Sequence, residues 1–318
     1  MVAFIFENLE LASEPVVPTK TTSVARSAAI AALLASAAGC QGAAASDDIH
    51  FQPHRAVYDV TLFSAVAASS VTGVTGRMVY ELGGSACEGY TQNMRFVTRM
   101  TNQEGSETLN DMRTSSWEET GGKRLRFSSS QYQNDELAIA SQGDAARSKD
   151  GDTAKVDLVK PEKSKVELPQ GTLFPMQHAT GLLKAAKASQ TVFTANLYDG
   201  SEKGDKYYLT TSVIGKHAGP GAIKMPASLK DGARLDMLQS WPVAISYFDP
   251  DKKKQDSVPA YELSFRYFEN GVTTDLKIDY GEFIIKGELK SLVFNDPGPS
   301  NCAGPANSTQ KPSASSKF

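Results

Sequence analysis

Polar and apolar residues alternate with a period of two along most of the chain from about residue 54, and this pattern constrains the fold most. In "HRAVYDVTLFSA", Tyr58, Val60 and Leu62 fall on one face, and Asp59 and Thr61 on the other. Such alternation is typical of strands with one buried face. Counted between turn residues, the chain contains a dozen or more such strands.

Glycine-containing turns join several of these strands. Gly121-Gly122 lies between two alternating runs, and two glycines easily adopt the positive φ angles of a tight hairpin. Asn270-Gly271 predicts a two-residue hairpin turn of the primed type, and a third strand is expected after Tyr280-Gly281. Further strand-like runs are "TVFTANLY", "KYYLTTSVIG" and "WPVAISYF".

One segment, "LFPMQHATGLLKAAKAS", has helical periodicity instead. Pro175 suits a first helical turn, and an apolar stripe follows it at helical spacing. The stripe consists of Met176, Ala179, Leu182, Leu183 and Ala186. One amphipathic helix among many antiparallel strands predicts a mainly β, single-domain fold, an open barrel or strongly curved sheet with the helix on its concave side.

The N-terminal region contains a candidate export signal. "RSAAIAALLASAAG" is apolar but too short to span a bilayer, and it fits the core of a secretory signal peptide. Two processing sites compete: lipoprotein cleavage before Cys40, and cleavage after Ala45 at an A-x-A pattern. The pattern favours Ala45. We therefore expect a leader over residues 1–45, a β domain over 46–302 and a disordered tail over 303–318, with no membrane-spanning segment in the mature protein.

Composition and motifs exclude several function classes. The formal net charge is −3 and charges of both signs are interleaved, which argues against nucleic-acid binding. The sequence lacks serine-hydrolase, P-loop and dinucleotide-binding motifs. None of the four histidines has a partner at metal-ligand spacing. We predict no catalytic residues, metal or cofactor.

Two features allow both a structural and a binding interpretation. His178 on the predicted helix either faces a cavity or is satisfied within the core. The aromatic residues of the C-terminal half are expected mostly in the core, but an open barrel can use some of them to line a groove for an apolar ligand. They include Trp241, Tyr247, Phe248, Tyr261, Phe265 and Tyr267.

Short motifs in a fixed order carry a resemblance over residues 50–302. The chain resembles the EipB family of cell-envelope integrity proteins of alphaproteobacteria. The motifs are Phe174-Pro175 with His178, Tyr198-Asp199-Gly200, Ile214-Gly215, Trp241-Pro242 with Ser246-Tyr247-Phe248, Pro259 with Tyr261-Glu262 and Ser264-Phe265, Asn270-Gly271, and Asp279-Tyr280-Gly281.

The resemblance implies an exported, periplasmic protein that folds as a spiral of antiparallel strands and supports envelope integrity, including under envelope stress, without being an enzyme. It also implies one disulfide, between Cys87 and Cys302. The even number of cysteines left after Cys40 is removed or lipidated agrees with this pairing. We expect the protein to bind an envelope protein or a lipid-like ligand; the alternative is a periplasmic carrier of lipid or lipoprotein with a half-open barrel.

Overall fold

Fourteen strands form one antiparallel sheet in the computed structural model, which describes residues 49–148, 151, 153–251 and 258–296. The expected mainly β fold is confirmed. The strands are β1 (His54–Ala65), β2 (Val71–Ser85), β3 (Gly89–Asn102), β4 (Glu107–Glu118), β5 (Arg124–Gln133), β6 (Glu136–Arg147), β7 (Ala154–Lys160), β8 (Ser164–Leu168), β9 (Val192–Leu197), β10 (Tyr208–Ile214), β11 (Ser240–Phe248), β12 (Tyr261–Phe268), β13 (Thr273–Asp279) and β14 (Phe283–Phe294). The helices are α1 (Pro175–Lys187) and the unexpected, four-residue α2 (Gly232–Leu235).

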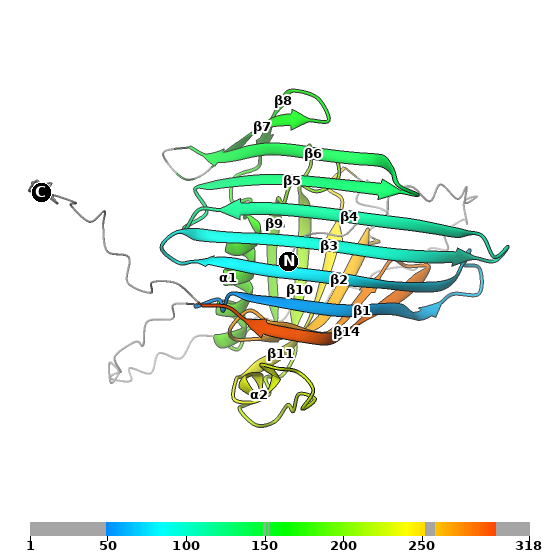
Figure 1. Ribbon diagram of the computed structural model, residues 1–318. Helices are drawn as coiled ribbons and strands as arrows, with labels where there is room; N and C mark the ends of the chain where they lie inside the picture. The colour runs from blue at the N-terminus through cyan, green and yellow to red at the C-terminus, as the bar shows by residue number, and fades with distance from the viewer. Residues whose placement is uncertain (1–48, 149–150, 152, 252–257, 297–318) are drawn as a thin grey trace, which may run out of the picture. The chain divides into compact units, whose positions relative to one another are not determined.

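The strand order places the first and last strands of the chain side by side. The order is β8-β7-β6-β5-β4-β3-β2-β1-β14-β13-β12-β11-β10-β9. Strands that follow each other in sequence pair throughout, except β8 and β9, and the β1–β14 ladder joins the two halves. The outer edges, β8 and β9, therefore come from the middle of the chain. Figure 1 shows β1–β6 as one layer, with β9 to β12 crossing behind it.

The two ends of the sheet overlap and form a spiral. Leu173, after β8, bridges to Leu197 at the end of β9. The Ser141 hydroxyl on β6 donates a hydrogen bond to the carbonyl of Gly200. A buried cluster from β5 to β8 and the segments after β8 and β9 fills the overlap: Leu125, Phe127, Ala145, Ala154, Val156, Leu158, Leu168, Phe174 and Tyr198. Side chains, more than strand ladders, hold the overlapping ends together.

The helix α1 lies on the inner side of the sheet, as expected. All five residues of its predicted stripe are buried, and Met176, Ala179 and Leu182 face β1 to β3 and β11 to β13 across an interior pocket. The segment between the overlapping edges thus fills part of the space that the curved sheet encloses.

The predicted hairpins are present and connect the expected strands, but one of their turns is of a different type. Gly121 and Gly122 both have positive φ angles between β4 and β5. The prediction of a two-residue primed turn at Asn270-Gly271 was wrong. The amide of Gly271 donates to the carbonyl of Phe268 at 2.9 Å, and Gly271 has φ of 86° whereas Asn270 is not in the positive-φ region. This geometry is a three-residue loop, in which only the last position needs a left-handed backbone.

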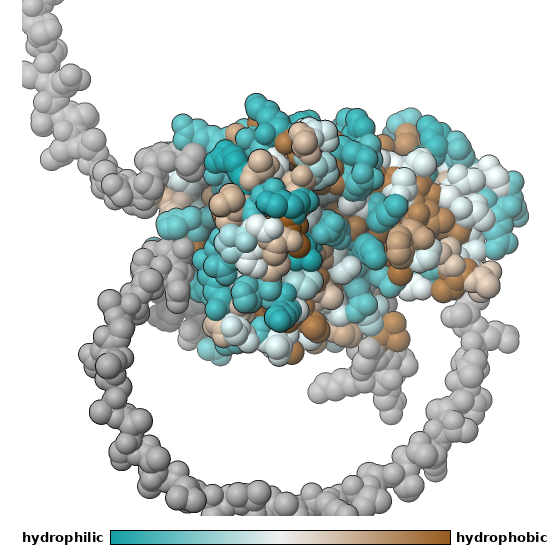
Figure 2. All heavy atoms as spheres, turned by 90° about the horizontal axis from the view of Figure 1, so that it is seen from below, coloured by the Kyte–Doolittle hydropathy of each residue, from teal (hydrophilic) through white to brown (hydrophobic). Residues whose placement is uncertain are grey.

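The outer surface is mixed in polarity. Hydrophilic residues cover much of the face in Figure 2, with a hydrophobic area toward one side. Phe63 and Val66, near the turn between β1 and β2, are among the large hydrophobic residues left exposed. Within the described ranges, no helix is both long and apolar enough to cross a membrane. The predicted leader, Cys40, Cys302 and the predicted tail all lie outside the described residues.

Candidate functional site

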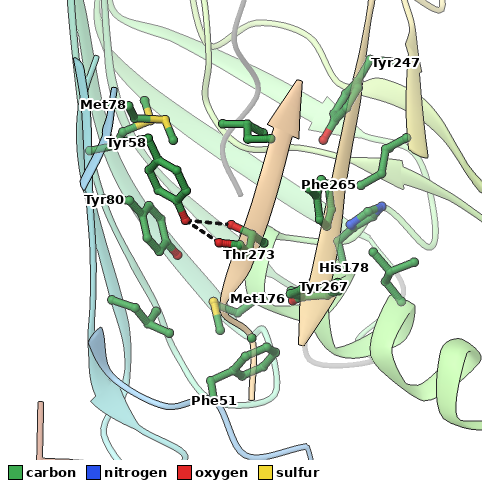
Figure 3. Close-up of a pocket in the computed structure, with 17 residues that line it drawn as sticks. Phe51, Tyr58, Met78, Tyr80, Met176, His178, Tyr247, Phe265, Tyr267 and Thr273 are labelled. Atoms are coloured by element: carbon green, nitrogen blue, oxygen red, sulfur yellow. Dashed lines mark hydrogen bonds between the residues drawn. The ribbon is translucent and has the colours of Figure 1, made fainter. Parts of the chain in front are cut away.

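An interior pocket lies between α1 and the inner face of the sheet (Figure 3). About 50 Å³ of it is open to the centres of water molecules, and its whole envelope up to the solvent is about 780 Å³. One water needs roughly 10–15 Å³ by this measure, so the side chains leave room for only a few waters inside. Its lining residues are Phe51, Tyr58, Met78, Tyr80, Leu82, Met94, Met176, His178, Ala179, Leu182, Ile245, Tyr247, Phe265, Tyr267, Gly271, Thr273 and Leu276.

Phe51 lies at one end of the pocket (Figure 3). Its ring is buried, lies 5.6 Å from the ring of Tyr90 in an edge-on arrangement, and packs over Gly271. A Cβ atom on Gly271 would be 2.4 Å from the Phe51 ring. The segment is fixed by a hydrogen bond from the Gln52 amide to the Asn270 carbonyl at 2.9 Å. Glycine is therefore needed at this position for two reasons: the backbone is left-handed, and an aromatic ring lies where a Cβ atom would be.

Tyrosine hydroxyls supply most of the polar groups on the wall formed by β1 and β2. The Tyr58 hydroxyl donates to the Thr273 carbonyl at 2.7 Å, and the Tyr80 hydroxyl donates to Gln92 Oε1 at 3.0 Å. Burial raises the pKa of Tyr58 to about 12 and raises that of Tyr80 as well. Both phenols are therefore neutral at physiological pH, and their hydrogen atoms are committed to the protein.

His178 lines the pocket and also has a hydrogen-bond partner in the core. The two interpretations of this residue, facing a cavity and being satisfied within the core, therefore both apply in part. Its Nε2 lies 3.0 Å from Thr210 Oγ1, which itself donates to the Ala195 carbonyl at 2.9 Å. Because the single hydroxyl hydrogen is used there, Nε2 must be the donor and Nδ1 carries the lone pair. Burial lowers the pKa of His178 to about 3, which keeps the imidazole neutral.

Glu118 at the end of β4 positions α1, and the sequence interpretation did not identify it. Its two carboxyl oxygens accept hydrogen bonds from the amides of Met176 (2.6 Å) and Gln177 (3.0 Å) in the first helical turn. Burial raises the pKa of Glu118 to about 7, although these bonds act in the opposite direction. One signal was available: Phe174 precedes Pro175 where Ser, Thr, Asp or Asn usually caps a helix, so the amides needed an acceptor from elsewhere.

Arg147 at the end of β6 completes this support. Its guanidinium donates to the carbonyls of Gly122 (2.8 Å) and Thr172 (2.5 Å) and to Gln177 Oε1 (2.6 Å). It also stacks 4.7 Å from the centroid of the Phe174 ring. Glu118 and Arg147 thus fix the start of α1, and through it the helical wall of the pocket.

The predicted aromatic residues divide between core and pocket. Tyr247, Phe265 and Tyr267 line the pocket, whereas Trp241 and Tyr261 are buried outside its lining. Cys87 lies in the turn between β2 and β3, where its amide donates to Ser85 Oγ at 3.3 Å. Since Cys302 lies outside the described residues, its pairing with Cys87 stays a prediction. Over the described part of the chain, no group of three or more acidic, histidine or cysteine side chains is arranged to hold a metal ion.

Comparisons with known proteins agree on one family. The model of the EipB-like family matches residues 45–296. The chain is 42% identical over 262 residues to the cell envelope integrity protein EipB of Brucella abortus (strain 2308), a match that covers 82% of this chain and 91% of that protein. It also matches the crystal structure of a beta-barrel-like protein from Brucella abortus, titled as a domain of unknown function, with a TM-score of 0.71 and 38% identity over 78% of this chain and 100% of that one.

Proposed function

The chain belongs to the EipB-like family, and from this premise we propose that it is a non-enzymatic periplasmic protein that supports cell-envelope integrity by holding a lipid-like ligand inside its spiral sheet. The relative from Brucella abortus is named for cell envelope integrity rather than for an enzymatic activity. That name supports a role in the envelope and leaves the ligand to be inferred from the pocket.

The observation that carries the ligand proposal is the pocket itself. Ten of its lining side chains are apolar, and the polar groups among the others are a few hydroxyls and one imidazole. The apolar residues are Phe51, Met78, Leu82, Met94, Met176, Ala179, Leu182, Ile245, Phe265 and Leu276. Sites that bind apolar small molecules typically have such a lining. A sheet curved around one helix leaves this space because α1 fills only part of the interior.

The direct test is complementation of a deletion strain challenged with detergent or a cell-wall antibiotic. Ala179→Phe places a ring in the pocket, and Lys184→Phe adds the same ring on the exposed side of α1 as a matched control. We expect the parent and Lys184→Phe to restore survival and Ala179→Phe to fail. Full rescue by a folded, pocket-filled Ala179→Phe protein would argue against ligand binding and favour a surface that contacts another envelope protein.

The proposed compartment depends on the N-terminal segment. Cleavage after Ala45 would start the mature protein at Ser46, and the A-x-A pattern that ends at Ala45 supports this site. We expect the mature protein in the osmotic-shock fraction with Ser46 at its N-terminus. Recovery in the membrane pellet with labelled fatty acid on Cys40 would show lipoprotein processing instead.

A carrier of lipid or lipoprotein is the second candidate, and the unclosed sheet favours it. The edge strands β8 and β9 overlap without forming a ladder with each other, so the interior is not sealed by a continuous ring of hydrogen bonds. Native mass spectrometry of protein from the periplasm is expected to show a bound acyl species. A carrier would also deliver that species to acceptor vesicles, whereas a protein that only stores or senses its ligand would retain it.

A further inference from the structure

The pocket has one property that narrows the class of ligand: among the residues that the structure describes, no charged side chain lines it. None of its 17 lining residues is Asp, Glu, Lys or Arg. We propose that the pocket accepts only electrically neutral parts of a ligand, a hydrocarbon chain with at most uncharged groups such as an ester or hydroxyl, and that any charged headgroup stays outside. This inference rests on the proposed lipid-binding function and specifies its ligand.

The titratable residues of the lining do not supply a charge either. His178 donates from Nε2 to Thr210, which fixes the neutral tautomer with the lone pair on Nδ1. Tyr58 and Tyr80 use their hydroxyl hydrogens on Thr273 and Gln92, and burial holds their pKa above the usual value. The described lining therefore offers no counter-ion for a ligand carboxylate, phosphate or amine.

Neutral hydrogen-bonding groups remain for the ligand. Within the described residues, the Tyr267 hydroxyl makes no hydrogen bond, and burial keeps it protonated by raising its pKa. It is therefore able to donate to an ester carbonyl or to accept from a hydroxyl. The lone pair on His178 Nδ1 is a second acceptor. These groups match the ester and hydroxyl groups that lie next to hydrocarbon chains in many lipids.

The dimensions of the pocket favour a slender chain. Only about 50 Å³ is open to the centres of water-sized molecules, so a branched or ring-shaped ligand would require large displacements. Three methionines line the space, from three separate elements: Met78 on β2, Met94 on β3 and Met176 on α1. Methionine side chains are unbranched and adaptable, so they can shift to admit a chain at a small cost.

A series of three probes with the same twelve-carbon chain tests the proposal. Methyl dodecanoate has no charge, dodecanoate is charged at one end, and dodecanedioate is charged at both ends. We expect the methyl ester and dodecanoate to bind at pH 8, because each has an end that can enter without charge. Dodecanedioate must bury a carboxylate, and we expect it to bind at least about 100-fold more weakly, given the cost of an unpaired buried charge. Isothermal titration calorimetry or displacement of a fluorescent apolar probe measures all three.

The outcomes separate this inference from the function on which it rests. Equal binding of all three probes would overturn the neutrality rule while leaving lipid binding intact. Failure of all three to bind would overturn both. If the hydrocarbon chain of the probe binds in this pocket, binding is lost in Ala179→Phe and retained in Lys184→Phe. If Ala179→Phe does not fold, Met94→Phe fills the same space from β3 and serves as the second variant.

Discussion

The buried carboxyl group of Glu118 should make the stability of the protein depend on pH. Its carboxyl group is 2% exposed and accepts hydrogen bonds from two amides of the first turn of α1. We propose to replace it by glutamine, which has nearly the same shape, keeps one oxygen acceptor and cannot ionise. The change therefore removes the titration of Glu118 while keeping its volume.

The sign and magnitude follow from the shifted pKa. Burial raises the pKa of Glu118 from 4.5 to about 7 in the folded protein, so the folded state holds its proton more tightly than the unfolded state. The stabilising contribution of the protonated carboxyl is fully present below pH 4.5 and is lost as the pH rises through about 7. At about 1.4 kcal/mol per pKa unit, the free energy of unfolding should fall by about 3 kcal/mol across this range because of Glu118.

Urea unfolding at pH 4.5 and pH 8, followed by circular dichroism, measures the effect. We expect the Glu118→Gln protein to lack about 3 kcal/mol of the decrease that the parent shows. Asp144→Asn is the matched control, because Asp144 is about half exposed and pairs with Arg126 at the surface. The control should follow the parent closely. Identical pH dependence in the parent and in Glu118→Gln would refute the argument that burial dominates this carboxyl.

Three further predictions concern individual contacts. Gly200 has φ of 72° and its Cβ would lie 2.2 Å from the Phe127 ring, so Gly200→Ala should destabilise the sheet overlap by about 2–4 kcal/mol in urea unfolding, and unchanged stability would contradict that contact. Phe51→Ala should lower the free energy of unfolding by about 3–5 kcal/mol, and the methyl ester probe should enter the variant faster in stopped-flow binding. Slower entry would show that Phe51 does not restrict access to the pocket. If Cys87 and Cys302 are paired, the denatured protein should take up thiol label only after reduction, and Cys302→Ser should lower stability by about 2–4 kcal/mol; two labels without reductant would exclude the bond.

Local patterns predicted the elements of this fold well. Alternation in "HRAVYDVTLFSA" placed Tyr58 and Val60 on the buried face of β1, and the apolar stripe identified α1. These properties depend on residues a few positions apart. The turn at Asn270-Gly271 was assigned the wrong type, because the same dipeptide fits a two-residue and a three-residue loop, and the packing of Phe51 on Gly271 is not visible in the local sequence.

The pocket could be predicted only in part, because it depends on distances between elements. Periodicity shows that Tyr247, Phe265 and Tyr267 point inward, but not whether facing side chains meet or leave a space. Glu118 lies in "SSWEETGG" and looks like a solvated acid beside a turn. Its burial results from the start of α1 packing over the end of β4, a contact between residues almost sixty positions apart.

The pairing of β1 with β14 has a consequence for how the chain assembles. Strands β1 to β8 form sequential hairpins that can build up while the chain is being made from its N-terminus. The far edge of β1, however, finds its partner only when the last strand is complete. Until then a twelve-residue strand exposes unpaired amides and carbonyls, the kind of edge at which nascent chains aggregate. A chain truncated before β14 would thus be left as two separate sheets, each open at the seam where the finished molecule is continuous.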